Sequence, residues 1–264
     1  ESISKEINSR SVQCFTFNEI HSNSVFVKIV YRLNLNFLLK EKIKLHREKA
    51  YRFIDDNRIS DVLFISPEVI SEDFLLEVKK NTRVHLYMWD GFKNKKNALS
   101  VLRYFNTKSS FDMFDCQHYG MNYIPLFAES EYCAKSVKII YDMSFCGTIH
   151  SDRPSWIGML LKYTKVEGLK IGLFLYYYSP LLLFIRLTLN KCCFNLFSKV
   201  SYDSFSKKDI ANLFRESKVV VDLTHPNQNG LTSRTFEALR TGSKLATNNK
   251  NCKILEKDFP SRIF

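Results

Sequence analysis

Short apolar runs alternate along the chain with longer stretches in which apolar residues recur at helical spacing. The clearest apolar runs span residues 61–66, 84–91, 169–178 and 219–223. Such runs are typical of strands in parallel sheets, and the stretches between them predict helices. Strand followed repeatedly by helix predicts an α/β fold.

Weaker signals fill in the rest of this pattern. Further strands are expected at residues 12–19, 108–112, 122–127, 200–202 and 244–249, and at the start of 142–153. Helices are expected at residues 1–10, through most of 25–58, at 66–81 and from Ser206, whose Ser-x-x-Asp opening approximates a capping box. A polar stretch without a clear period, 128–141, predicts a linker. With 264 residues, the chain suits two Rossmann-like domains, at 1–130 and 142–264.

The segment after the apolar run 219–223 holds the densest group of candidate binding residues. Gly230 and Thr232 open the helix that follows a polar loop. A helix N-terminus beyond the end of a parallel strand is a ready anion site, because its first amides have no partner in the helix. The amides of Gly230, Leu231 and Thr232 are therefore candidates to bind a phosphate.

Two charged side chains on this helix extend the candidate site. Arg234 can bind a diphosphate through two parallel hydrogen bonds, and Glu237, about one turn later, can accept hydrogen bonds from a sugar hydroxyl. An Arg and a Glu three residues apart are also often a solvated ion pair, and this alternative stays open. The ligand expected here is a nucleoside diphosphate.

A second loop, after the strand that begins near residue 142, has a similar character. Gly147 and Thr148 follow that strand, and glycine lets the backbone approach a phosphate closely because it has no Cβ. Arg153 stands at the start of the next helix and adds a cation. An ordinary surface arginine is the competing interpretation.

Two further polar residues lie near predicted strand ends. Asp90 ends the run 84–91 beside a lysine cluster, where a carboxylate can act as a general base or cap the following helix. His225 follows the run 219–223, where it can contact a ligand or only close the loop.

The residues from His225 to Glu237 read H-P-x-Q-x-G-L-T-x-R-x-F-E, which resembles the donor-binding half of GT-B glycosyltransferases. The run is most similar to family-1-type and CgeB-like enzymes of bacterial lipopolysaccharide and capsule synthesis. F-x-G-T at 145–148 is similar to the loop that begins GT-B donor domains, and Y-M-W-D-x-x-K-N at 87–94 is similar to a CgeB-like sequence. Asn229 stands where the broader retaining superfamily has an acid, which leaves the stereochemical outcome open.

This resemblance implies two domains that face across a cleft, the first on the acceptor side and the second binding the donor. It implies transfer of a sugar from a nucleoside diphosphate sugar to a hydroxyl of a growing bacterial surface glycan. Asp90 would deprotonate the acceptor, and His225 would contact the donor or leaving group. Donor binding would fall to Gly147, Thr148, Arg153, Asn229, Gly230, Leu231, Thr232, Arg234 and Glu237, and catalysis to Asp90, His225 and Arg234.

Composition narrows the class of partner. Lys and Arg outnumber Asp and Glu 39 to 27, giving a net charge of +12 that favours anionic partners. The lysine-dense stretches 40–49 and 93–96 do not interleave with aromatic residues, so no nucleic acid is expected.

Seven scattered cysteines without C-x-x-C spacing predict a reduced, cytoplasmic protein. No D-x-D sequence stands at a strand end, so we expect no metal, and no cofactor besides the nucleotide sugar as co-substrate.

Residues 181–197 leave one alternative open. They are apolar and aromatic with Arg186 and Lys191 among them, which predicts either a packed amphipathic helix or a helix lying in a membrane interface. The apolar span 171–185 is interrupted by Pro180 and is too short to cross a bilayer. In the second case the protein would be peripheral on the inner face of the cytoplasmic membrane, next to a lipid-linked acceptor.

Two other functions fit the same residues. One is a catalytically idle scaffold or membrane-surface binding protein with a GT-B-like fold, and the other is a nucleotide-sugar epimerase. The chain opens on a helix-like piece where GT-B folds start on a strand, and it lacks the final helix that GT-B folds return to the first domain. We therefore expect both termini to be trimmed.

Overall fold

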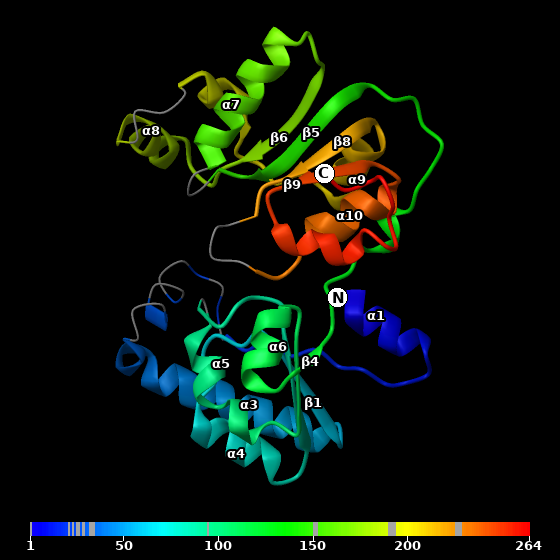
Figure 1. Ribbon diagram of the computed structural model, residues 1–264. Helices are drawn as coiled ribbons and strands as arrows, with labels where there is room; N and C mark the ends of the chain where they lie inside the picture. The colour runs from blue at the N-terminus through cyan, green and yellow to red at the C-terminus, as the bar shows by residue number, and fades with distance from the viewer. Residues whose placement is uncertain are drawn as a thin grey trace. The chain divides into compact units, whose positions relative to one another are not determined.

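The computed structural model of the chain describes residues 2–20, 22, 24, 27, 30, 31, 35–93, 95–149, 153–189, 194–224 and 229–264. The chain forms two compact units, Glu1–Pro125 and Leu126–Phe264 (Figure 1). Each unit contains a parallel sheet with helices packed on it, which confirms the predicted α/β class. The cleft expected between the domains stays a prediction.

The first unit holds a four-stranded parallel sheet in the order β1-β2-β3-β4. Its strands are β1 (Asp61–Ile65), β2 (Arg83–Met88), β3 (Thr107–Ser110) and β4 (Asn122–Tyr123). Its helices include α1 (Ser2–Ser9), α3 (Lys40–Asp56), α4 (Glu72–Lys79), α5 (Lys96–Ser100) and α6 (Met113–Tyr119). The strands expected near residues 61, 84, 108 and 122 are confirmed, with shorter bounds.

One face of this sheet carries the core of the first unit. Val62 and Phe64 of β1 pack with Leu86 and Met88 of β2 against residues from helices α3 to α6. Because side chains alternate along a strand, the residues between them point to the other face. There Leu63 is 45% exposed, so the run 61–66 is not buried on both faces as its apolar character suggested.

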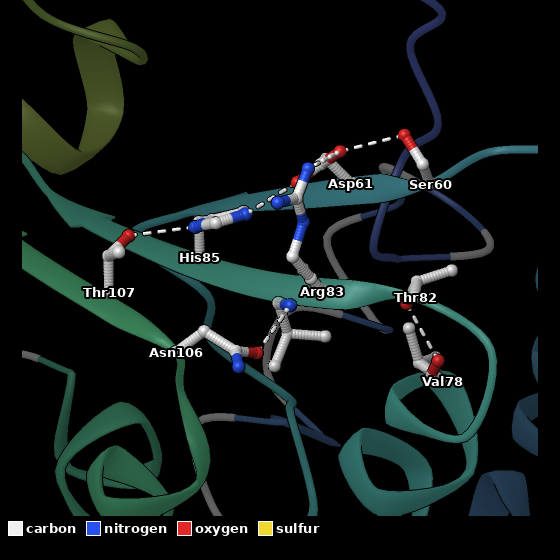
Figure 2. Close-up of polar contacts among 9 residues, drawn as sticks. Ser60, Asp61, Val78, Thr82, Arg83, His85, Asn106 and Thr107 are labelled. Atoms are coloured by element: carbon white, nitrogen blue, oxygen red, sulfur yellow. Dashed lines mark hydrogen bonds and ion pairs between the residues drawn. The ribbon is translucent and has the colours of Figure 1, made fainter.

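A polar network crosses that second face at the start of three strands (Figure 2). The Asp61 carboxylate accepts hydrogen bonds from Ser60 Oγ at 2.7 Å and from Arg83 Nη2 at 2.9 Å, and it contacts His85 Nε2 at 3.0 Å. The other ring nitrogen of His85 lies 2.7 Å from Thr107 Oγ1. The hydrogen bonds from Arg83, Ser60 and His85 lower the pKa of Asp61, because they stabilise its ionised form.

The strand expected at residues 12–19 is wrong. This segment makes no strand pairing, and its Phe15 and Phe17 rings pack instead on Phe53 of α3, at centroid distances of 5.9 and 5.4 Å. The alternation of apolar residues thus reflects one side of an extended chain resting on a helix. At its end, Glu19 accepts hydrogen bonds from the amides of Glu68 and Val69, each at 2.8 Å, and so ties down the loop after β1.

The second unit holds a five-stranded parallel sheet in the order β7-β6-β5-β8-β9. Its strands are β5 (Tyr141–Thr148), β6 (Ile171–Tyr176), β7 (Val200–Ser201), β8 (Ser217–Asp222) and β9 (Lys244–Thr247). Its helices include α7 (Arg153–Val166), α8 (Pro180–Leu189), α9 (Lys207–Arg215) and α10 (Ser233–Thr241). The strand order reverses at β5, which creates a topological switch point between β5 and β8.

Helices cover both faces of this second sheet. Residues of α7 and α8 form one core with Phe145 and Leu175, and residues of α9 and α10 form another with Cys146 and Val220. This is the doubly wound arrangement of a Rossmann-like domain. The capping box expected at Ser206 is confirmed, with Asp209 as its second member.

The stretch 128–141, expected as a linker, packs on the second unit instead. It contains the short helix η3 (Ser130–Tyr132), and the Tyr132 side chain is 2% exposed in the core beside α9 and α10. Arg215 of α9 donates hydrogen bonds to the carbonyls of Cys133, at 2.9 Å, and Glu131. A single buried aromatic residue in a polar stretch gives no periodic signal, so the pattern could not reveal this packing.

Candidate functional site

The loops after β5 and β8 flank the switch point of the second sheet. In open α/β sheets, ligands bind beyond the carboxyl ends of the strands at such a point. Gly147 and Thr148 are the last residues of β5, and Arg153 begins α7. Asn229, Gly230 and Leu231 precede α10, and Thr232 is its N-cap. The fold therefore brings the candidates of the two sequence segments to one edge of one sheet.

Arg153 links the ends of the two central strands. Its Nη1 donates a hydrogen bond to the Thr148 carbonyl at 3.2 Å, and its Nη2 donates to the Leu223 carbonyl at 3.0 Å. A Cβ on Gly147 would lie only 3.2 Å from that Nη1 atom. Glycine at this position thus leaves room for the guanidinium, which lies directly at the switch point.

Asp222, the last residue of β8, organises the start of α10. Its Oδ2 atom accepts hydrogen bonds from Thr232 Oγ1 at 2.7 Å and from Thr235 Oγ1 at 2.9 Å. The Thr232 hydroxyl also accepts a hydrogen bond from the Thr235 amide at 3.2 Å, which caps the helix. Because the Thr232 hydroxyl already makes these hydrogen bonds, it is not the group that this end of α10 would offer to a ligand. The groups that it can offer are its first backbone amides, which have no acceptor within the helix.

Asparagines that follow β9 hold the loop before α10. Asn249 Nδ2 donates to the Gly230 carbonyl at 3.1 Å, and Asn251 Nδ2 donates to the Asn229 carbonyl at 2.7 Å. Asn248 Oδ1 accepts a hydrogen bond from the amide of Thr224 at 2.8 Å. The polar end of β9 thus fixes the backbone of the candidate loop.

Arg234 and Glu237 form a largely buried ion pair on α10. Arg234 Nη1 lies 3.0 Å from Glu237 Oε2, and the two side chains are only 23% and 16% exposed. The guanidinium lies over the Phe214 ring, 5.2 Å from its centroid, and the Tyr132 hydroxyl hydrogen-bonds Glu237. The solvated ion pair, which was the alternative interpretation of the three-residue spacing, is therefore wrong. Burial raises the pKa of Glu237, and its neighbours Arg234 and Tyr132 oppose that rise only in part.

The charges of both arginines act on one buried residue, Cys146 of β5. Its thiol is buried, which raises its pKa, while the charges of Arg234 and Arg153 act in the opposite direction. Both guanidinium groups therefore lie within electrostatic range of a single side chain. Arg153 begins the helix after β5 and Arg234 lies in the first turn of the helix after β8, so the two cations come from the helices on either side of the switch point.

Asp90 lies in the first unit, just after β2. Its Oδ1 atom accepts a hydrogen bond from the Gly91 amide at 2.9 Å, and its own amide donates to Ser66 Oγ at 3.2 Å. These contacts fix the turn that follows β2. Two other residues named from the sequence, His225 and Asn94, lie outside the described residues.

The sequence did not single out Asp222, Thr235 or Tyr132. Asp222 and Thr235 do leave a signal, an acid that ends a β-branched run and a threonine three residues after the N-cap. Tyr132 leaves none, because its contact with Glu237 exists only after folding. In the part of the chain that the structure describes, no three His, Cys, Asp or Glu side chains gather as a metal site would require.

No family model and no curated protein sequence matches the chain. An α-glucosyltransferase solved with UDP and a 13-mer DNA is similar in structure at 15% identity and a TM-score of 0.53, over 82% of this chain and 64% of that one. This likeness shows the fold, two Rossmann-like domains of the GT-B type, and confirms the predicted fold class.

Two further matches have lower TM-scores. A chain of the glycosylation-associated Gap123 complex from Streptococcus agalactiae is 13% identical, with a TM-score of 0.42, over 77% of this chain and 45% of that one. A protein described as a UDP-N-acetylglucosamine 2-epimerase from Listeria monocytogenes is 9% identical, with a TM-score of 0.48, over 82% and 64%. The chain thus spans less than two thirds of the length of each of the three.

Proposed function

We propose that this chain is a glycosyltransferase that moves a sugar from a nucleoside diphosphate sugar to a hydroxyl of a growing bacterial surface glycan. The observation that carries the proposal is the position of Arg153 and of the N-terminus of α10 at the switch point of the second sheet, with Arg234 two residues after the N-cap of that helix. Fixed cations beside the first amides of a helix suit the diphosphate of such a donor.

The chemistry needs charge neutralised as the sugar departs. Negative charge grows on the leaving diphosphate while the sugar carbon becomes oxocarbenium-like. Arg153 and Arg234 would stabilise this charge together with the amides of Leu231 and Thr232. Because these groups supply positive charge, the proposed reaction uses no metal.

The remaining candidates complete the proposed site. Glu237 would accept a hydrogen bond from a ribose or sugar hydroxyl, oriented for this by Tyr132. Asn229 and Gly230, held by the asparagines after β9, would shape the loop around the donor. Gly147 and Thr148 would form its opposite wall. His225 would contact the leaving group, and Asp90 would deprotonate the acceptor.

Two similarities to other proteins support this assignment. The run from His225 to Glu237 resembles that of bacterial family-1-type and CgeB-like transferases. The α-glucosyltransferase of similar fold was solved with UDP, a nucleoside diphosphate of the proposed kind. A surface glycan as acceptor follows from the sequence resemblance alone.

A transfer assay tests the proposal. Purified protein is incubated with UDP- and GDP-sugars labelled in the sugar, together with a bacterial envelope glycan fraction, and the products are separated. We expect label in the glycan with at least one donor, and loss of that transfer in Arg234→Met combined with Glu237→Gln, which removes both charges of the buried ion pair at similar volume. Label that stays on the nucleotide with a changed sugar configuration would indicate an epimerase. No reaction, together with no nucleotide binding, would indicate an idle scaffold.

A further inference from the structure

Helix α8 exposes apolar side chains on the surface of the second unit. Leu183 and Leu187 are fully buried in the core, as expected for one face of a packed helix. The outward side, however, carries Leu181 at 66% exposure, Leu182, and Ile185 at 43% exposure. A helix that is apolar on its solvent side as well as on its core side indicates an interaction surface, which a partner molecule or a membrane covers.

Helix α7 adds a second exposed stripe. Met159, Tyr163 and Val166 are exposed, and their spacing of four and three residues puts them on one side of the helix. Ile157 of α7 lies in the same core cluster as Leu183 of α8, so both helices cover the same face of the sheet (Figure 1). The two stripes belong to one side of this unit.

Positive charge accompanies these stripes. Residues 156–199 contain one acid, Glu167, and six basic residues, namely Lys162, Lys165, Lys170, Arg186, Lys191 and Lys199. Lys162, Lys165 and Lys199 are exposed. Apolar side chains among basic residues match the boundary between the acyl chains and the phosphates of an anionic bilayer, whereas a protein partner would need its own acidic surface.

We propose that the exposed sides of α7 and α8 bind the surface of an anionic lipid bilayer. Leu181, Leu182 and Ile185 enter the boundary between headgroups and acyl chains, and the lysines meet lipid phosphates. The helices lie in the plane of the membrane, since no helix among the described residues is long and apolar enough to span it. This inference goes beyond the proposed function and does not depend on it.

Sedimentation with vesicles tests the proposal on the full chain. Vesicles of phosphatidylcholine alone are compared with vesicles that also contain phosphatidylglycerol, at low and high salt. We expect binding to the anionic vesicles that weakens with salt, and at least tenfold weaker binding for Leu181→Asn combined with Ile185→Asn. The matched control combines Leu76→Asn with Ile254→Asn, two exposed apolar residues outside α7 and α8, and should bind like the wild type.

The tryptophans supply a second readout that does not rely on the α8 variant. The chain has two, Trp89 in the first unit and Trp156 on α7, so Trp89→Phe leaves a single reporter beside the proposed surface. Brominated anionic lipids should quench Trp156 fluorescence. Equal binding to neutral and anionic vesicles, unchanged binding by the α8 variant, or a dimer that this variant abolishes would overturn the proposal, the last outcome assigning the surface to a second copy.

Discussion

The Arg234 guanidinium donates a 3.0 Å hydrogen bond to the carboxylate of Glu237, three residues further along α10. Both side chains are largely buried, so each charge relies on the other for compensation. The pair also lies at the edge where a donor diphosphate is proposed to bind. Its structural and binding roles therefore need separate tests.

Removing one member of this pair should destabilise the second unit. Arg234→Ala leaves the Glu237 carboxylate buried without its cation, which typically costs about 3 kcal/mol. Arg234→Met combined with Glu237→Gln removes both charges at similar volume and should cost about 1 kcal/mol or less. Urea unfolding of both variants measures this difference. Equal losses in the two would show that the ion pair is not coupled as the geometry requires.

The Asp222 network should stabilise the start of α10. Asp222→Ala leaves the half-buried hydroxyl of Thr232 and the buried hydroxyl of Thr235 without their acceptor, and we expect a loss of about 2 kcal/mol. Thr232→Ala removes the helix cap and should cost about 1 kcal/mol. Thr188→Ala, at an exposed site on α8, is the control and should change the unfolding free energy by less than about 0.5 kcal/mol. A Thr232→Ala effect no larger than this control would contradict the capping role.

Gly147→Ala should disturb the position of Arg153. The added Cβ would lie 3.1 Å from Cζ of Phe145 and 3.2 Å from Nη1 of Arg153, so these groups must shift. We expect a stability loss of about 1 kcal/mol and a smaller thermal shift with the best-binding nucleoside diphosphate. Gly91→Ala is the control, because nothing lies within 4 Å of its Cβ position. A full nucleotide shift in Gly147→Ala would remove Arg153 from the proposed site.

Acid should weaken the polar network on the first sheet. Hydrogen bonds from Arg83, Ser60 and His85 hold the pKa of Asp61 below its ordinary value. A lowered pKa in the folded state means that the stabilisation is present above about pH 4 and is lost as the pH falls further. Asp61→Asn should therefore lower the melting temperature slightly at pH 7 and have less effect at pH 3. An equal difference at both pH values would contradict this assignment, and Glu256→Gln at an exposed site is the control.

Strands β1, β2, β6 and β8 could be predicted because each one contains a short, mainly apolar run between polar residues. The run 219–223 favours a buried strand over a helix because it is short, rich in β-branched valine and bounded by polar residues. The segment 12–19 misled because its alternation is also satisfied by Phe15 and Phe17 resting on Phe53. Periodicity indicates that one side of a segment is apolar, but it does not indicate whether that side packs in a sheet or against a helix.

The candidate site was predictable to a smaller extent. Spacing alone placed Arg234 and Glu237 on one side of a helix, and a strand end placed Gly147 near a loop. Spacing could not reveal that Arg153 reaches the Leu223 carbonyl, 70 residues away, or that Tyr132 reaches Glu237. Those contacts depend on the strand order of the sheet, which no local pattern encodes.

The central claim, that the second unit binds a nucleoside diphosphate between the loops after β5 and β8, is tested most directly by calorimetric titration. UDP, GDP and CMP are titrated into the wild type and into Arg234→Met combined with Glu237→Gln, the variant expected to keep its stability. We predict saturable binding of one diphosphate to the wild type and at least tenfold weaker binding to the variant. No binding of any nucleotide, or equal affinity in both proteins, would contradict the claim.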